Sequence, residues 1–69
     1  MWIRLARGLI NLDKVDTVRA VILHEQPAIE FSIGEKTVSM IAADFPSAER
    51  MVDDIEHALR GGAHFFDLR

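Results

Sequence analysis

The strongest pattern in the chain is an apolar stripe with helical spacing in its second half. Ser47 is a candidate N-cap for this helix, Glu49 lies in its first turn, and the pair Gly61 and Gly62 predicts its end. A lone amphipathic helix must bury its stripe against other elements, so we expect it to cover a sheet. Apolar residues recur at spacings of three and four, at Ala48, Met51, Val52, Ile55, Ala58 and Leu59.

The residues before this helix have the composition and alternation of β-strands. Turns are expected at Gly8 and at residues 34–36, and Pro27 predicts a break at residues 25–27. The fold class that follows is α+β, an antiparallel β-meander of about four to five strands packed by one C-terminal α-helix. We expect a single small domain spanning residues 1–69, with strands at 1–7, 9–12, 17–24, 28–33 and 37–42.

The chain has 69 residues and no cysteine. A chain of this length buries a small core, and small domains compensate with disulfides, a structural metal or self-association. The lack of cysteine excludes disulfides, thiolate zinc sites and cysteine nucleophiles. Self-association is therefore the expected source of extra stability, and we expect a homo-oligomer, in its simplest form a dimer, that can also bind another protein.

Charge and hydropathy disfavour two classes of partner. The formal net charge is -3, and the basic residues are spread from Arg4 to Arg69 without a stripe that could neutralise phosphates, so nucleic acid is not the expected partner. No apolar run approaches the roughly 20 residues that cross a bilayer, so we expect no membrane insertion. No secretory signal pattern is visible, and a cytoplasmic location is expected.

Candidate catalytic and metal-binding residues lack the required spacing. His24, His57 and His64 do not form a zinc-ligand pattern, and the serines have no nucleophile motif around them. The carboxylates Glu49 and Asp53, with Glu56, share one helical face, which is typical of a solvated surface. We therefore expect no enzymatic activity, no metal and no cofactor.

Five apolar residues are candidate interface residues: Trp2, Val21, Leu23, Phe65 and Phe66. Trp2 is adjacent to Ile3, so in a strand only one of them faces the helix, and Trp2 belongs either to the core or to an interface. Val21 and Leu23 lie on the second apolar side of a strand that is either central in its sheet or covered there. Phe65 and Phe66 point to opposite sides if extended; the alternative is an extra helical turn after Gly62 with both rings folded back.

The first forty or so residues also resemble a known family. The matching features are Ile3-Arg4-Leu5, the turn glycine Gly8, Ile10-Asn11-Leu12, Val15, Val18, and the run from Pro27 to Lys36. They resemble short bacterial proteins of the FlbD/SwrD type, and this resemblance implies a motility-associated role. A looser similarity extends to uncharacterised bacterial proteins that begin Trp-Ile-x-Leu-x-x-Gly and continue Asn-Leu-Asp-x-Val, for which it implies no function.

The function expected from these observations is that of a small non-enzymatic, self-associating protein-protein interaction module. Its motivation is the short cysteine-free chain, the strand with two apolar sides and the aromatic tail. Two alternatives stay open at this point. One is a small-ligand or nucleic-acid binding accessory protein, and the other is the motility-associated role implied by the family resemblance.

Overall fold

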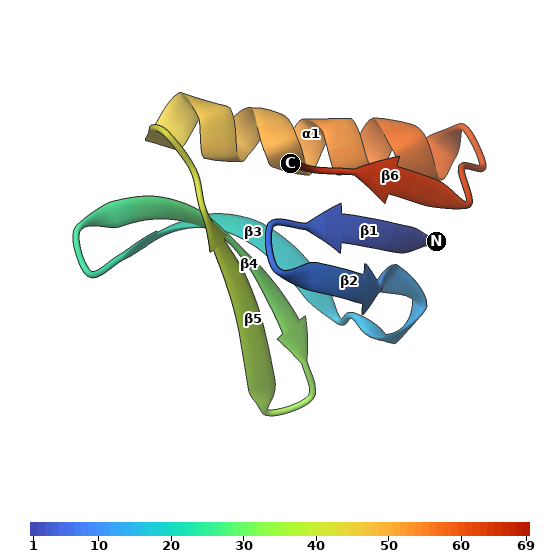
Figure 1. Ribbon diagram of the computed structural model, residues 1–69, viewed down its shortest axis with the longest axis horizontal. Helices are drawn as coiled ribbons and strands as arrows, with labels where there is room; N and C mark the ends of the chain where they lie inside the picture. Colours follow the sequence, from blue (N-terminus) through green and yellow to red (C-terminus); the bar gives the residue numbers. More distant parts are fainter.

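The computed structural model describes residues 1–69 and confirms the α+β class (Figure 1). Six strands precede or follow one α-helix, so the chain ends in a strand rather than in the helix. The elements in chain order are β1 (Trp2–Leu5), β2 (Gly8–Asn11), the 3-10 helix η1 (Leu12–Lys14), β3 (Thr17–Leu23), β4 (Gln26–Ile33), β5 (Lys36–Ile41), α1 (Phe45–Arg60) and β6 (Phe65–Asp67).

The strands divide into two three-stranded sheets instead of one continuous meander. The first sheet has the order β2-β1-β6, in which β1 pairs antiparallel with β2 and parallel with β6. The second sheet is the antiparallel meander β3-β4-β5. The strands of the two sheets cross steeply in Figure 1, and α1 runs along one side of both. Each strand that pairs on one side only is an edge: β2 and β6 in the first sheet, and β3 and β5 in the second.

Two of the expected turns lie elsewhere. The β1–β2 turn is formed by Ala6 and Arg7, and Gly8 is already the first residue of β2. The expected break at residues 25–27 is also wrong, because β4 begins at Gln26 and contains Pro27. Pro27 is tolerated there because it lies next to the strand end, where a missing N–H interrupts little of the ladder. The turn at Gly34 is confirmed, with φ of 60°.

The N-cap of α1 is Asp44, and the expectation that Ser47 is the cap is wrong. The Asp44 side chain accepts a 2.7 Å hydrogen bond from the Ser47 backbone N–H, and the helix therefore starts three residues earlier than that cap would place it. Pro46 lies in the first turn, where a missing N–H costs no helical bond. The expected end is confirmed: Gly62 has φ of 74°, and Ala63 N–H donates to the Ala58 carbonyl in a Schellman motif.

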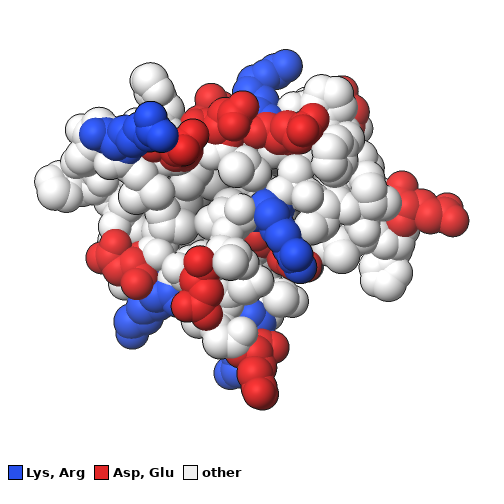
Figure 2. Space-filling model, turned by 180° about the vertical axis from the view of Figure 1, so that it is seen from behind, with Lys and Arg blue, Asp and Glu red and all other residues white.

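The core lies between the two sheets and the inner side of α1. Ile3, Phe31 and Ile55 are almost fully buried within it. The helical stripe is confirmed except at its end, because Leu59 is 50% exposed and Ala58 is the half-buried residue of that turn. An α-helix has 3.6 residues per turn, so the inner position one turn after Ile55 falls between Ala58 and Leu59. The smaller residue, Ala58, lies closer to the core. The opposite side of α1 carries a row of acidic side chains, which Figure 2 shows over the helix.

Candidate interaction surfaces

The outer side of the first sheet presents apolar side chains to solvent. Ile3 and Leu5 point into the core, so the alternate residues Trp2 and Arg4 point outward. The strand register places Trp2 beside Asn11 and Phe65, and places Arg4 beside Leu9 and Asp67. We call this surface the Trp2 face; it consists of Trp2, Arg4, Leu9, Asn11, Phe65 and Asp67.

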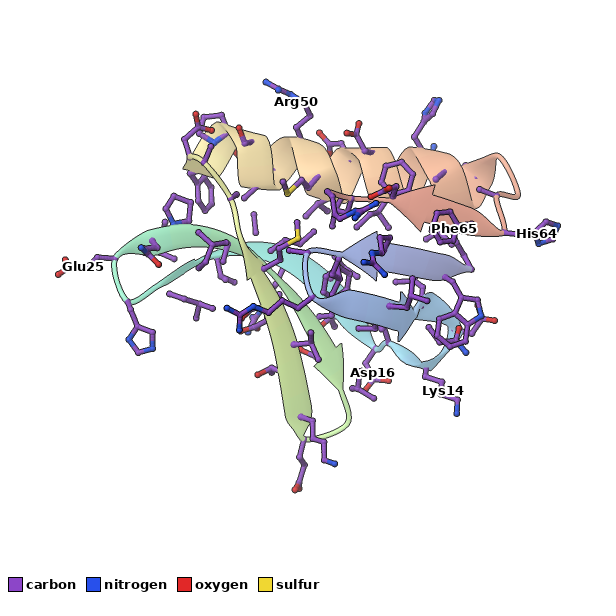
Figure 3. All side chains as sticks on the ribbon, in the orientation of Figure 1. Lys14, Asp16, Glu25, Arg50, His64 and Phe65 are labelled. Carbon is purple, nitrogen blue, oxygen red and sulfur yellow. The ribbon has the colours of Figure 1, made fainter.

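The apolar residues of the Trp2 face are neighbours and are only partly covered. Trp2 is 48% exposed and Phe65, directly beside it on β6, is 55% exposed. Leu9 is exposed on the other side of β1. Figure 3 shows Phe65 on the strand next to β1. Single exposed apolar residues are ordinary on protein surfaces, whereas a contiguous group indicates a site of interaction.

Unlike charges lie among these apolar side chains. Asp67 Oδ2 is 3.2 Å from Nη2 of Arg69, and hydrogen bonds from Arg69 hold the pKa of the Asp67 carboxyl below its usual value. Arg4 is the register neighbour of Asp67, and its Nε is buried without a hydrogen-bond partner. Buried polar atoms are normally paired, so this nitrogen has an unused donor. The Trp2 face therefore combines an apolar surface with both signs of charge.

The aromatic tail, Phe65 and Phe66, is extended, which is one of the two alternatives predicted from the sequence. Phe66 is half-buried and packs against the core, whereas Phe65 points outward. The alternative of an extra helical turn after Gly62 is wrong, because residues 65–67 form β6. Trp2 N–H donates to the His64 carbonyl and Leu68 N–H donates to the Arg4 carbonyl, both at 2.9 Å. The tail thus completes the first sheet of its own chain.

Val21 and Leu23 do not belong to the Trp2 face. They are half-buried on the outer side of β3, which belongs to the second sheet. Of the two alternatives for this strand, a central position is wrong, because β4 occupies the centre and β3 is an edge strand against which α1 packs. Its outer side shares a face with Ile41 across Ala28. The structure therefore brings Trp2 and Phe65 together and separates Val21 and Leu23 from them.

A groove runs between the free edges of β2 and β5. Its volume is about 940 Å³, and its walls are mainly apolar. The residues of interest that sequence reasoning missed are Leu9, Val38 and Ile41, which are exposed, and the cations Arg7 and Lys14. The signal for Leu9 was present, because Leu9 and Ile10 are adjacent in a strand and only one can face the core. We call this feature the β2–β5 groove.

The histidines are dispersed over the molecule. His24 lies in the β3–β4 turn, His57 on the exposed side of α1, and His64 projects away from the domain before β6 (Figure 3). No group of three or more His, Asp or Glu side chains is close enough together to hold a metal ion. On α1, Glu56 pairs with Arg60 at 3.2 Å, while Glu49 and Asp53 are exposed.

Comparison with models of protein families, with curated proteins and with solved structures finds no match to this chain. The resemblance to FlbD/SwrD-type proteins and the motility role that it implies therefore stay predictions from the sequence. No helix in the structure combines the length and apolar character that a membrane crossing requires. The case for a function depends on the two surfaces described above.

Proposed function

We propose that this protein is a non-enzymatic interaction module that self-associates through the Trp2 face. The observation that carries the proposal is the adjacency of Trp2 and Phe65, two large aromatic side chains that are each about half exposed on the same side of one sheet. Aromatic residues are enriched at the centres of protein interfaces, where they supply large buried areas. A two-fold dimer buries two copies of each ring, so the gain from each ring counts twice.

Charge supports a second copy as the partner. A two-fold interface places the same surface patch on both sides, so the patch has to complement itself. The Trp2 face carries a cation, Arg4, and an anion, Asp67, which are neighbours in the strand register. Pairing across the two-fold axis brings Arg4 of one copy to Asp67 of the other. The dispersed histidines and the solvated carboxylates of α1 support an interaction role rather than catalysis.

Sedimentation equilibrium across the micromolar range tests this proposal. Burying one phenylalanine ring contributes roughly 1.5 to 3 kcal/mol, so Phe65→Ser should raise the dimer dissociation constant at least about tenfold. Leu59→Ser is the matched control, because Leu59 is exposed to nearly the same extent but lies on α1 away from the Trp2 face. It should leave the dissociation constant unchanged.

A second variant tests the charge argument. Asp67→Lys places cations opposite Arg4 of the second copy and should weaken the dimer, whereas Asp53→Lys on α1 makes the same charge change at an exposed helical position and should not. A protein that stays monomeric up to millimolar concentration would overturn the proposal. A dimer that responds equally to Phe65→Ser and Leu59→Ser would place the interface elsewhere.

A further inference from the structure

The β2–β5 groove has a free strand edge on each wall. The Ala42 N–H donates to the Pro27 carbonyl, so by the alternation of an antiparallel ladder Val38 and Met40 bond to β4. The backbone groups of Thr37, Ser39 and Ile41 therefore point away from the sheet. By the same reasoning from the bond between Leu12 N–H and the Met1 carbonyl, Leu9 of β2 points its backbone groups away from β1.

The edge of β5 lacks the devices that normally block strand addition. Natural edge strands carry charges, prolines or bulges, or are covered by another element. β5 has one charged residue, Lys36, at its start, and Thr37 to Ile41 are uncharged and mostly exposed. The opposite edge strand of this sheet, β3, contacts α1 and carries a charged residue, Arg19, within the strand. β5 is thus the edge at which the second sheet can be extended.

The charged residues that line the groove indicate the charge of its partner. The only charged residues that line it are Arg7 and Lys14, and no Asp or Glu lines it, although the whole chain has a net charge of -3. Arg7 precedes β2 and Lys14 follows it in η1, so the two cations flank the strand (Figure 3 labels Lys14). Two copies of this groove repel each other, because both carry the same sign. Charge complementarity therefore favours a partner with carboxylates.

We infer that the β2–β5 groove is a docking site for an extended segment of another protein, apolar in its centre and acidic at both ends. The segment adds to the edge of β5 as a fourth strand of the second sheet, as in known cases of strand addition. Alternate side chains enter the groove against Val38 and Met40, and carboxylates of the segment are attracted to Arg7 and Lys14, the cations that line the groove. The groove shares Trp2, Leu9 and Asn11 with the Trp2 face, so a docked segment competes with self-association through that face.

Three synthetic peptides of about seven residues, roughly 20 Å when extended, provide the probes. The first is Glu-Thr-Val-Thr-Val-Thr-Glu, the second replaces both Glu by Lys, and the third replaces both Val by Ser. Fluorescence anisotropy is measured on the Phe65→Ser variant, so that the outcome does not depend on self-association. The first peptide should bind at least about tenfold more tightly than the other two. Amide NMR shifts should concentrate on β5 and Leu9.

Two pairs of variants test the contacts. Charge reversal at Arg7 and Lys14 together should reverse the preference to the Lys peptide, while the same reversal at Arg50 and Arg60, which do not line the groove, should preserve it. Ser39→Pro removes an outward N–H and no ladder bond, so it should abolish binding and leave the far-ultraviolet circular dichroism unchanged. If Ser39→Pro unfolds the protein, Val38→Ser serves instead and should weaken binding about tenfold.

Three outcomes would overturn the inference. The first is no binding of the Glu peptide at millimolar concentration, or binding that ignores charge reversal at Arg7 and Lys14. The second is loss of the wild-type dimer in Ser39→Pro, which identifies the β5 edge as a contact between two copies. The third is binding of decanoate, an anionic amphiphile without a peptide backbone, with the same affinity and the same NMR shifts as the Glu peptide.

Discussion

Arg19 and Glu30 lie directly opposite each other on β3 and β4, and Nε and Nη2 of Arg19 donate to the same carboxylate oxygen of Glu30, at 3.1 and 2.9 Å. Glu30 is 9% exposed and is the one charged residue among the buried residues. Arg19 is mostly exposed, so its charge stays hydrated while it neutralises the carboxylate. This pair holds a buried charge in the central strand of the second sheet.

Removing one partner of this pair should cost more than removing both. Arg19→Met leaves the Glu30 carboxylate without its donor, and we expect a loss of about 1 to 2 kcal/mol, less than for a fully buried pair because Arg19 faces water. Arg19→Met combined with Glu30→Met should recover most of that loss. Urea unfolding of the wild type, both single variants and the double variant provides the cycle. An Arg19→Met protein as stable as wild type would mean that water reaches the carboxylate.

Ile55 and Leu59 lie one turn apart on α1 and should respond very differently to truncation. Ile55 is 2% exposed, and Ile55→Ala should lower the free energy of unfolding by about 2 to 4 kcal/mol. Leu59→Ala should change it by less than about 0.5 kcal/mol. Ile55→Asp buries an unpaired carboxylate and should prevent folding. Thermal unfolding followed by circular dichroism measures all three, and equal effects at the two positions would contradict the packing of α1.

The β3–β4 turn offers a stabilising substitution. His24 and Glu25 both have positive φ, 48° and 66°, a conformation that costs a non-glycine residue about 1 to 2 kcal/mol. Glu25→Gly should therefore raise the melting temperature by about 4 °C or more. Glu35→Gly is the matched control, since Glu35 occupies the other two-residue hairpin turn without a positive φ. It should leave the melting temperature unchanged or lower it.

The Asp44 cap predicts a specific dependence on pH. Side-chain and backbone hydrogen bonds from Ser47 hold the pKa of Asp44 below its usual value. A carboxyl group with a lowered pKa in the folded state contributes stability above its unfolded pKa of about 3.9, and the contribution is lost as the pH falls through the folded pKa. Asp44→Ala should thus lower the melting temperature by several degrees at neutral pH and by less in acid.

Two further variants separate the cap from its charge. Asp44→Asn keeps a side-chain acceptor, because asparagine caps helices as well as aspartate does, and should lose little stability at neutral pH. Its melting temperature should also fall less steeply below about pH 4 than that of the wild type. Asp53→Asn, at an exposed carboxylate in the middle of α1, is the control. Parallel melting curves for Asp44→Asn and wild type from neutral pH into acid would refute the role of this carboxylate.

Features that depend on neighbouring residues were predictable from the sequence. The alternation of strand side chains predicts that Trp2 and Ile3 face opposite sides, and it separates Phe66 from Phe65. The Gly62 end of α1 also followed from local rules. The cap was mislocated because Asp44 and Ser47 are both good cap residues, and the choice between them depends on where the chain leaves β5. Pro27 was misjudged because its cost depends on the strand end, which the sequence does not mark.

Features that depend on distant pairing were not predictable. Nothing in residues 65–67 identifies β1 as their partner, and that pairing alone places Phe65 beside Trp2. The β2–β5 groove likewise arises because the meander divides into two sheets whose free edges face one another. Only the three-dimensional arrangement shows that Val38 and Ile41 both border a groove with Arg7 and Lys14.

The parallel pairing of β1 with β6 has a mechanical consequence. A force that pulls the N-terminal end of β1 away from the C-terminal end of β6 draws these neighbouring strands past each other along their axes. The inter-strand hydrogen bonds, including those from Trp2 N–H and Leu68 N–H, are then loaded together in shear instead of opening one after another. The domain should therefore resist extension from its two ends far more strongly than extension that peels the β3-β4-β5 meander, whose antiparallel hairpins open from their free ends.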